Sequence, residues 1–399
     1  MPRGSKGTAN RAKRAAAAIG SVTLAATAFT ALGGSPATGA STKGTHAPYK
    51  FGVLESTTGT YGPVGQPELD GIKLAVKEIN KSGGVDGHKL QYELVDTQGT
   101  VSLSTTGFKK LALQDSLPVI LGPGITPPGL ADAPLAGRYK TVNINFIAQT
   151  QAWKTSKADG HVFEVVASQL YLAEDMMKYM VGTNGVKSAA LIYANVPFGV
   201  LAKSYFAEKA KAEGIKITTV NDFTATKFTF AAQATKVAAA NPPGLFLWGS
   251  GAPSDGLMLK AVRVAGYKGP IVGDVDYGNA AIPSEAGPAG TTVVGFSQID
   301  YVHPNKATKA FIKGYEAAYH SEPEFLAGAT YDGVHVLAKA AKKAKKFTAS
   351  ALTSALQKVN YQGVTGHFKY TSKYHGGPGR TAYVPIAFTN GKYVTPKKP

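Results

Sequence analysis

The sequence predicts an α/β protein that contains two units built on parallel sheets. From residue 49 onward, short apolar runs alternate with amphipathic helical segments, which is the pattern of repeated strand–helix units. The alternation restarts after residues 161–166, which indicates a second unit of the same kind. The chain has 399 residues and is 44% hydrophobic, so it is long enough for two domains with sizeable cores.

The first 40 residues differ from the rest of the chain. Residues 3–14 carry five basic side chains and no acidic one, residues 15–34 are small and apolar, and small residues follow at 37–40. This layout predicts a secretory signal peptide over residues 1–40, with a flexible leader over residues 41–48. An uncleaved membrane anchor is the alternative interpretation of the same apolar run.

Cysteine content and charge exclude several classes. The chain contains no cysteine, which excludes a lipid anchor processed at cysteine and a disulfide framework. The formal net charge is +18, and five of these charges lie in the signal segment. Nucleic-acid binding is excluded because the chain is predicted to be exported and has no basic stripe interleaved with aromatic residues.

The first unit begins with a strand, a glycine-rich loop and an amphipathic helix. In that helix Leu69, Ile72, Val76 and Ile79 are spaced by three and four residues, which predicts one buried stripe that ends before the glycines at 83–84. The pattern predicts further elements of this unit. Strands are expected at residues 51–54, 90–95, 118–121 and 141–144, and helices at 103–113 and 126–138.

The second unit and the C-terminal part follow the same logic. The second unit is expected to have helices at 170–181, 200–213, 228–240 and 254–265, and strands at 188–193, 215–221, 245–248 and 270–272. The remainder predicts a strand at 292–298, helices at 305–319, 328–345 and 349–359, and short strands at 366–370, 383–388 and 392–394.

No pattern of catalytic residues is present. The sequence has no His-Glu-x-x-His motif and no Gly-Lys-[Ser/Thr] phosphate loop, and Gly249-Ser250-Gly251 lacks the outer glycine spacing of a nucleophile elbow. Its eight histidines are dispersed, without zinc-ligand spacing on one helix face. We therefore expect no enzyme activity, no catalytic residue, no cofactor and no metal site.

Loops that follow the strands are the candidate ligand sites, because ligands of open α/β sheets bind beyond the carboxyl ends of the strands. The loop at 55–66 is rich in glycine, and Tyr61 and Val64 are its candidate ligand contacts. In the loop at 121–128, Gly124 permits a tight turn, and Thr126 is predicted to cap a helix that has Pro127 at its first position. A mobile surface loop and simple helix capping are the respective alternatives.

Residues 49–87 resemble the opening of type I periplasmic binding proteins, especially the leucine/isoleucine/valine-binding group. The resemblance rests on GIKLAVKEINKSGG at 71–84, the Val-Asp-Gly that follows, and Leu-Gly-Pro at 121–123, and it extends over about residues 49–394. It implies two Rossmann-like lobes with parallel sheets joined by a three-strand hinge. The chain would cross between lobes near residues 166, 298 and 372, giving lobe 1 at 49–166 plus 299–372 and lobe 2 at 167–298 plus 373–399.

The resemblance also implies a ligand site. Gly124 and Thr126 lie where family members hold an α-carboxylate. Where the family has a Ser-Pro-Ser-Ala-Thr-like run, this chain has a less polar one that contributes Ile147, Ala148 and Gln149, of which only Ala148 matches well.

The second lobe contributes the remaining candidates. Phe198 replaces a family tyrosine, and Ser250 stands at a position that is often aromatic. Asp274 and Asp276 flank the position whose acidic residue pairs with a ligand ammonium, so either aspartate is a candidate, with a turn or cap role as the alternative. Asp332 belongs to a Tyr-Asp pair that the resemblance marks as structural.

The function implied is that of an exported, non-lipidated solute-binding protein of an ABC-type importer. It would be a monomer that captures a branched-chain or hydrophobic amino acid, or a related small carboxylate, between two lobes that close by hinge motion. Its partners would be permease and ATPase subunits on separate chains. A ligand-sensing module for a membrane receptor or regulator is the alternative, and a secreted hydrolase would need a nucleophile–base pair that the sequence lacks.

Overall fold

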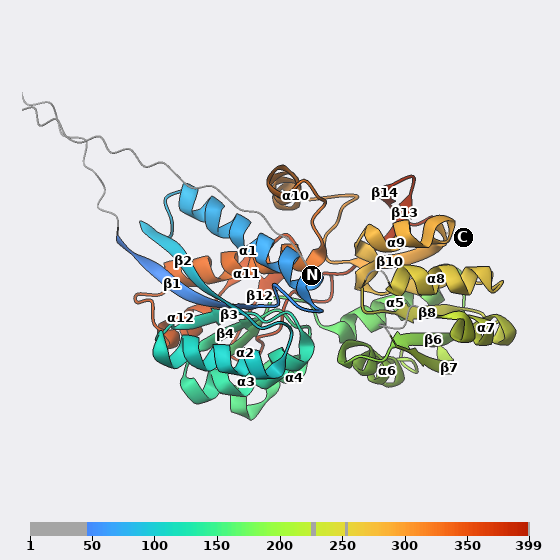
Figure 1. Cartoon of the computed structure of the whole chain (residues 1–399), viewed down its shortest axis with the longest axis horizontal. Helices are drawn as coiled ribbons and strands as arrows, with labels where there is room; N and C mark the ends of the chain where they lie inside the picture. The colour runs from blue at the N-terminus through green and yellow to red at the C-terminus, as the bar shows by residue number, and fades with distance from the viewer. Residues whose placement is uncertain (1–45, 225–228, 252–253, 398–399) are drawn as a thin grey trace, which may run out of the picture. The chain divides into compact units, whose positions relative to one another are not determined.

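A computed structural model describes residues 46–224, 229–251 and 254–397 (Figure 1). The predicted signal peptide and residues 41–45 of the predicted leader lie outside this range. The last leader residues belong to strand β1 (His46–Glu55), because His46 already pairs with His88 of the neighbouring strand. Among the described residues, no helix combines the length and apolar character needed to span a membrane.

The first sheet is entirely parallel, as predicted. Its five strands lie in the order β2-β1-β3-β4-β5, and each neighbouring pair is parallel. The strands after β1 are β2 (His88–Asp96), β3 (Val119–Leu121), β4 (Val142–Asn145) and β5 (Val162–Glu164). Because all strands run the same way, the loops that follow β1, β3 and β4 meet at one edge of the sheet.

Helices cover both faces of this sheet (Figure 1). On one face α1 (Gly62–Lys81) packs against α11 (Phe325–Lys343), and on the other α2 (Val101–Lys109) packs against α3 (Thr126–Tyr139). The alternating strand residues of β3 separate the two cores: Val119 and Leu121 join the cluster of Ile72 and Val76, whereas Ile120 joins the cluster beneath α2 and α3. The predicted stripe on α1 is thus confirmed.

The second sheet has seven strands in the order β14-β13-β10-β9-β8-β6-β7. The five strands from β10 to β7 are parallel, whereas β13 runs antiparallel to β10 and β14 antiparallel to β13. Their bounds are β6 (Ser188–Ala194), β7 (Lys216–Phe223), β8 (Leu245–Trp248), β9 (Ile271–Gly273), β10 (Val293–Ser297), β13 (Val384–Thr389) and β14 (Lys392–Val394). The prediction of a second parallel α/β unit is confirmed, with an antiparallel edge added.

The other helices follow the predicted order. They are α5 (Gln169–Asn184), α6 (Pro197–Lys209), α7 (Ala231–Ala240), α8 (Ser254–Val264), α10 (Lys306–Tyr319) and α12 (Ala349–Leu356). The sequence analysis missed α4 (Thr150–Lys154), α9 (Ala281–Ala286) and β11 (Asn360–Gln362), which pairs with β12 (His367–Lys369). These elements are too short to show a periodic pattern.

Three segments that connect the two sheets are hydrogen-bonded to one another. The side chain of Gln298 accepts a bond from the amide of Ala167 at 3.0 Å, and the hydroxyl of Tyr383 donates to the carbonyl of Ala167 at 2.7 Å. The hydroxyl of Tyr370 donates to the carbonyl of Glu164 at 2.6 Å. These bonds lie near the three crossings that the resemblance implied, whose boundaries stay a prediction. Residues 44–399 as a whole form one compact unit.

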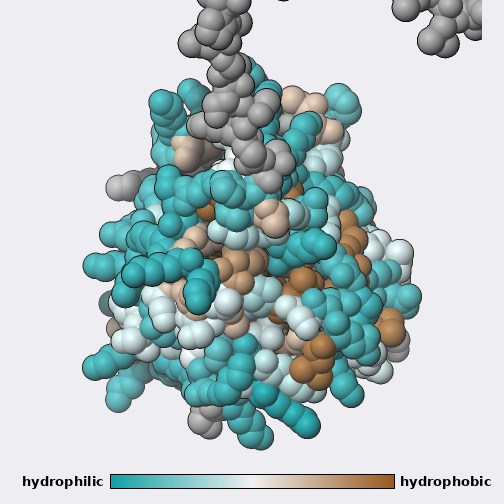
Figure 2. Space-filling model, turned by 90° about the vertical axis from the view of Figure 1, so that its left-hand side faces the viewer, coloured by the Kyte–Doolittle hydropathy of each residue, from teal (hydrophilic) through white to brown (hydrophobic). Residues whose placement is uncertain are grey.

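The surface is mostly hydrophilic on the face shown in Figure 2, where hydrophobic residues are scattered among polar ones. Large hydrophobic side chains that are exposed include Leu94 of β2 and Leu103 of α2. Scattered exposed hydrophobic residues are normal for soluble proteins and do not by themselves indicate a docking surface.

Candidate functional site

Two buried glutamates meet at the turn after β3. Glu55 ends β1 and Glu68 lies on the sheet-facing side of α1, and both are fully buried. A Cβ atom added to Gly124 would overlap the carboxylate of Glu68, and one added to Gly122 would lie 3.5 Å from Oε1 of Glu55. The turn therefore needs glycine at position 124 because the backbone passes directly over the Glu68 carboxylate.

The two glutamates form a coupled acidic pair. Burial raises the pKa of Glu55 well above its usual range, and the charge of Glu68 raises it further. Burial raises the pKa of Glu68 to about 7, while a hydrogen bond with Glu55 lowers it. No hydrogen bond of good geometry reaches their carboxylate oxygens from any described donor, so a bond between them requires one carboxyl to keep its proton.

This pair was not predicted from the sequence, although two signals of it are present there. Glu55 directly follows an apolar strand, at the edge where ligand loops were expected. Glu68 lies one helical turn before Ile72, so the same spacing that buries Ile72 places Glu68 on the buried side. A charged residue within an apolar helix stripe therefore indicates a buried carboxyl group.

The predicted cap at Thr126 is wrong. The N-cap of α3 is Ile125, whose side chain makes no capping bond, and Thr126 is the first helical residue. Pro127 and Pro128 carry no N–H group, so Gly129 is the first residue after them that can donate, and its amide bonds to the carbonyl of Ile125 at 3.0 Å. The cap residue is therefore Ile125, whereas the helix itself begins at residue 126, as predicted. Thr126 itself is buried, at 9% exposure.

The other candidates from the first loop lie at the start of α1. Tyr61 is the N-cap residue of α1, and its ring lies against Gly99 of the turn after β2. The amide of Val64 donates to the carbonyl of Tyr61 at 3.0 Å. Both side chains are half-buried, and their ligand contacts stay predictions.

Of the three candidates in the loop after β4, two lie in the hydrophobic core and one contacts α6. Ile147 belongs to the core cluster beneath α3, and Ala148 belongs to the larger core cluster. Gln149 is fully buried, and its Oε1 accepts a hydrogen bond from the hydroxyl of Tyr205 on α6 at 2.9 Å. Its Nε2 has no partner among the described residues. Of the three, only Gln149 has a polar group free to meet a ligand.

The second sheet contributes an aspartate cluster. Asp255, Asp274 and Asp276 each offer an oxygen, and these three oxygens lie within 4.8 Å of one another. Asp274 accepts bonds from the amides of Asp276 at 3.0 Å and Gly249 at 2.8 Å, which confirms the turn role that was its alternative. Asp255 accepts bonds from the amides of Ser250 and Gly251. These two aspartates hold loops, whereas no side-chain donor among the described residues pairs with Asp276.

Burial raises the pKa of all three aspartates, and repulsion from neighbouring carboxylates adds to this for Asp274 and Asp276. The pKa of Asp255 rises to about 6 because its carboxyl is buried. Burial, followed by the charges of its aspartate neighbours, raises the pKa of Asp274 well above its usual range. Burial also raises the pKa of Asp276 well above its usual range, and the charges of Asp255 and Glu324 raise it further.

Phe198 and Ser250 are the remaining candidates from the second sheet. Phe198 is the second residue of α6, and its ring centroid is 5.5 Å from that of the buried Trp248, so it forms part of an apolar wall. The hydroxyl of Ser250 is 3.2 Å from that of Ser254, within the turn that Asp255 closes. Ser250 is therefore already engaged in the loop structure.

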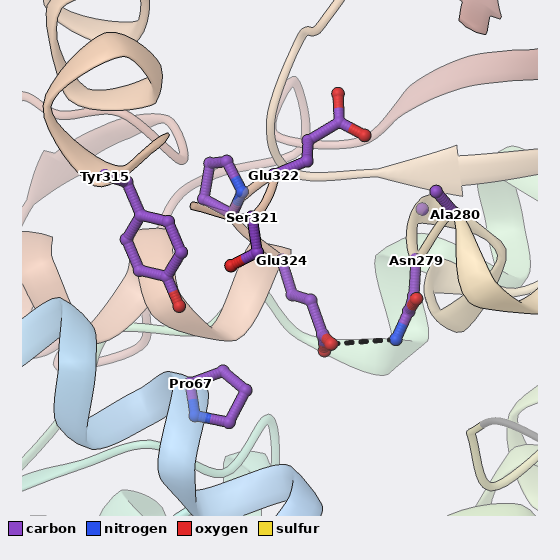
Figure 3. Close-up of a pocket in the computed structure, with 9 residues that line it drawn as sticks. Pro67, Asn279, Ala280, Tyr315, Ser321, Glu322 and Glu324 are labelled. Carbon is purple, nitrogen blue, oxygen red and sulfur yellow. Dashed lines mark hydrogen bonds between the residues drawn. The ribbon is translucent and has the colours of Figure 1, made fainter. Parts of the chain in front are cut away.

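A cavity of about 240 Å³ lies between α1, α10 and the segments after β9 and before α11 (Figure 3). It is lined by Pro67 of α1, Tyr315 of α10, residues 278–280 after β9, and residues 321–324 before α11. Figure 3 shows Glu324 extended toward Asn279, whose Nδ2 donates to its carboxylate at 2.8 Å. Burial raises the pKa of Glu324 to about 7.

A second cavity of about 490 Å³ has aromatic walls. Trp153, Tyr171, Tyr205 and Tyr374 line it together with the buried carboxyl of Glu164. Burial raises the pKa of Glu164 well above its usual range. Arg380 forms an ion pair with Glu174 and lies over the ring of Tyr171, so this cavity already has a cation at its border.

Replacing Gly124 with alanine is expected to reduce ligand affinity more than tenfold, because the new methyl group would displace the Glu68 carboxylate or the turn. Gly379→Ala is the matched control, since a Cβ there meets nothing within 4 Å. Calorimetric titration with any ligand found for the wild-type chain measures both variants. Equal affinities for the two would show that the turn after β3 is not part of the site.

Comparison with known proteins places the whole fold among binding proteins. The family model described as "Periplasmic binding protein" matches residues 48–388. The leucine-, isoleucine-, valine-, threonine-, and alanine-binding protein of Pseudomonas aeruginosa is 21% identical over 326 residues, which cover 81% of this chain and 86% of that protein. The leucine-specific-binding protein of Salmonella typhimurium is also 21% identical, over 81% of this chain and 87% of that protein.

Solved structures with the same fold include two transport-related proteins. The branched-chain amino acid transporter substrate binding protein LivJ of Streptococcus pneumoniae, solved in complex with isoleucine, superposes with a TM-score of 0.77 at 22% identity. The superposition covers 87% of this chain and 97% of the LivJ chain. The leucine binding protein LivK of Thermotoga maritima gives a TM-score of 0.76 at 19% identity, with 87% and 97% covered. At these identities the likeness establishes the fold.

Proposed function

The chain belongs to the type I periplasmic binding protein family, similar to leucine-binding proteins, and from this premise we propose that it captures a small solute for an ABC-type importer. The observation that carries the proposal is the extent of the family match, which spans both sheets and the loops at their carboxyl ends. Hydrophobic amino acids and related small carboxylates are the first ligand class, by analogy with what the curated relatives are named for.

The mechanism we propose is capture without chemistry. Two parallel sheets present loops from their carboxyl ends, and a ligand that contacts loops of both sheets favours the conformation in which they are close. Gln149 from the first sheet and Phe198 from the second would contribute a polar contact and an apolar wall. No step requires a nucleophile or a cofactor, and permease and ATPase subunits on other chains would complete the importer.

Asp276 is our candidate for the ammonium partner. Asp274 is committed to two backbone amides, whereas Asp276 is half-buried and, among the described residues, has only the amide of Gly251 near its carboxylate. An ammonium group beside it would form a charge-assisted hydrogen bond and relieve the repulsion from Asp255 and Glu324. This assignment selects one of the two aspartates that the sequence left open.

The experiment is a thermal-shift panel on the chain from residue 44, which forms one compact unit. A ligand at 100 times its Kd adds about 2.7 kcal/mol, which should raise the melting temperature by several degrees. The panel contains leucine, isoleucine, valine, phenylalanine, polar amino acids, and amines and acids of similar size. Binding of no small solute would overturn the proposal.

Asp276→Asn is expected to weaken binding of an amine-bearing ligand about 10-fold to 100-fold, because it removes the charge of the ammonium partner. Glu285→Gln on α9, an exposed carboxyl nearby in the chain, is the matched control and should bind as wild type. Calorimetry at one ionic strength compares the two. An unchanged affinity for Asp276→Asn would remove its ammonium role. Loss of labelled-ligand uptake on deletion of the gene tests transport separately.

A further inference from the structure

Exposed lysine side chains gather where α11 ends and on the turn after α12. We name six of them the lysine face: Lys339, Lys342, Lys343, Lys345, Lys346 and Lys358. The first three lie on one side of α11, because they are three and four residues apart. The Nζ atom of Lys343 donates to the carbonyl of Lys358 at 2.8 Å, which brings the turn after α12 onto the same surface.

The lysine face has little acidic charge to balance it. Among the described residues, none of its six lysines forms an ion pair. After Asp332 the sequence contains no aspartate or glutamate as far as residue 399. Asp86, in the turn before β2, is an acidic residue at this end of the fold. The lysines therefore repel one another, and like charges three and four residues apart destabilise a helix unless something offsets them.

The dipole of α11 accounts for only part of this charge. Cations stabilise the last turn of a helix, and Lys342 and Lys343 lie in that turn. Lys345 and Lys346 come after the helix has ended, and Lys339 lies before its last turn. Because the effect of the dipole falls off within one turn, it does not explain a basic surface that continues on both sides of it.

The lysine face lies at the end of the first sheet that is opposite the candidate ligand loops. The ring of Phe347, which directly follows Lys346, stacks on that of Tyr49 with their centroids 4.3 Å apart. From Tyr49 the strand β1 runs about 20 Å to Glu55, where the first ligand loop begins. Figure 2 looks onto the end of the molecule at which β1 begins in Figure 1, and the surface there is mostly hydrophilic. A partner on this face would therefore leave the ligand loops open.

The N-terminal part of the chain enters the fold at the same end. β1 begins at His46, and the ring of His88 stacks on the rings of both His46 and Tyr49. An uncleaved membrane anchor is the alternative interpretation of residues 15–34, and residues 35–45 span at most about 40 Å when fully extended. Such an anchor would hold the lysine face close to a bilayer, which favours a membrane over a soluble polyanion as its partner.

A nucleic acid fits this face less well. Proteins that bind single-stranded nucleic acids offer exposed aromatic rings on which the bases stack. Two rings lie among these lysines and both are half-buried: Phe347 stacks on Tyr49, and Tyr361 lies under the Nζ atom of Lys339, 4.7 Å from it. The face therefore offers charge alone, which suits phosphate groups spread over a surface.

We propose that the lysine face docks the protein onto a membrane that contains anionic phospholipids, while the ligand loops at the other end of the first sheet stay accessible. The attraction is electrostatic and reversible. Each lysine near an anionic surface strengthens binding about fivefold, and the attraction decays within a Debye length. This inference goes beyond solute capture, because it concerns where the protein is held and not which solute it binds.

Sedimentation with lipid vesicles tests the proposal on the chain from residue 44, which forms one compact unit. The vesicles consist of phosphatidylcholine alone, or of phosphatidylcholine and phosphatidylglycerol in a two-to-one ratio. We expect at least tenfold stronger binding to the mixed vesicles, and loss of that binding when the salt concentration rises from about 0.05 M to about 0.5 M. Equal binding to the two kinds of vesicle, or binding to neither, would overturn the proposal.

Two triple variants locate the binding surface. The face variant combines Lys342→Gln, Lys345→Gln and Lys346→Gln. The matched control removes three exposed lysines from α6, α7 and α8, and combines Lys203→Gln, Lys236→Gln and Lys260→Gln. The face variant should bind the mixed vesicles about 30-fold to 100-fold more weakly than wild type, whereas the control, with the same net charge, should lose less than about threefold. Equal losses for both would show that net charge alone drives binding, and would contradict the lysine face.

A third variant and a competitor complete the test. Replacing the same three lysines of the face with arginine keeps the charge and should leave vesicle binding unchanged. A short DNA duplex that displaces the protein from mixed vesicles at equal phosphate concentration would replace the membrane with another polyanion and overturn the proposal. Circular dichroism melting confirms that each variant is folded. Because these measurements contain no solute, their result does not depend on the proposed function.

Discussion

Replacing Asp332 with alanine is expected to lower the free energy of unfolding by about 3–4 kcal/mol. Asp332 is fully buried on α11, and its carboxylate accepts bonds from the amides of Val364 and Thr365 at 2.9 and 2.8 Å and from the Thr365 hydroxyl at 2.7 Å. The hydroxyl of Tyr361 donates to it at 3.2 Å. Alanine would leave these buried donors without an acceptor, so the loss exceeds that of one hydrogen bond.

Urea unfolding at pH 7 measures this effect. Asp332→Asn keeps one acceptor oxygen of the same shape, so it should lose clearly less stability than the alanine variant. Tyr361→Phe removes only the longest of the bonds and should cost about 1 kcal/mol or less. A loss for Asp332→Ala no larger than that for Tyr361→Phe would show that these donors find other partners. The sequence had marked Asp332 as structural, and its bonds confirm that interpretation.

Glu68→Gln is expected to stabilise the ligand-free protein, increasingly so as the pH rises from 5 to 8. Glu68 has a pKa of about 7 in the folded chain, against a usual value of 4.5. Between these values the unfolded chain has lost the proton that the folded chain keeps, so unfolding releases a proton and stability falls as the pH rises. For a fully buried group, the loss of unfolding free energy between pH 4.5 and pH 7 is on the order of 3 kcal/mol. Glutamine does not titrate, so the Glu68→Gln variant does not undergo this loss.

The measurement is the difference in unfolding free energy between wild type and Glu68→Gln at several pH values, without ligand. Titratable groups facing Glu68 are Glu55 and Glu324, and both carry raised pKa values, so they lower wild-type stability in the same direction. The pKa of His335, lowered to about 4, acts in the opposite sense below pH 6.5 but cancels in the difference. A difference that stays constant between pH 5 and 8 would contradict the assigned pKa.

The strands and helices were largely predictable because each carries a local pattern. β8 (Leu245–Trp248) and β14 (Lys392–Val394) begin and end where the sequence placed them, and glycines with positive φ at 83 and 84 follow the end of α1 as expected. The start of α3 at Thr126 was predicted correctly, but its cap was assigned to Thr126 instead of Ile125, because threonine is a common N-cap residue and isoleucine is not. The three-residue strand β11 was missed because its pairing with β12 is the only signal it gives.

The candidate site was less predictable because its organisation is not local. Glu68 could have been noticed as a charge on an apolar helix stripe, but nothing near Glu324 in the sequence indicates that it reaches Asn279, 45 residues earlier in the chain. Asp274 and Asp276 look alike in sequence, and only their different hydrogen bonds distinguish a loop-holding aspartate from a candidate ligand partner. Ile147 was chosen for its position in a loop, yet its side chain is part of the core.

The antiparallel strand β13 makes completion of the second sheet depend on residues about 90 positions after β10. β10 pairs with β9 on one side, but its other edge is filled only by residues 384–389, with Val294 opposite Ala387 and Ser297 opposite Val384. Until residues 384–389 leave the ribosome, the edge of β10 exposes unpaired amides and carbonyls, which are a template for wrong pairing with other chains. A nascent chain halted shortly before residue 384 should therefore aggregate through β10, and a factor that shields this edge would matter most during that interval.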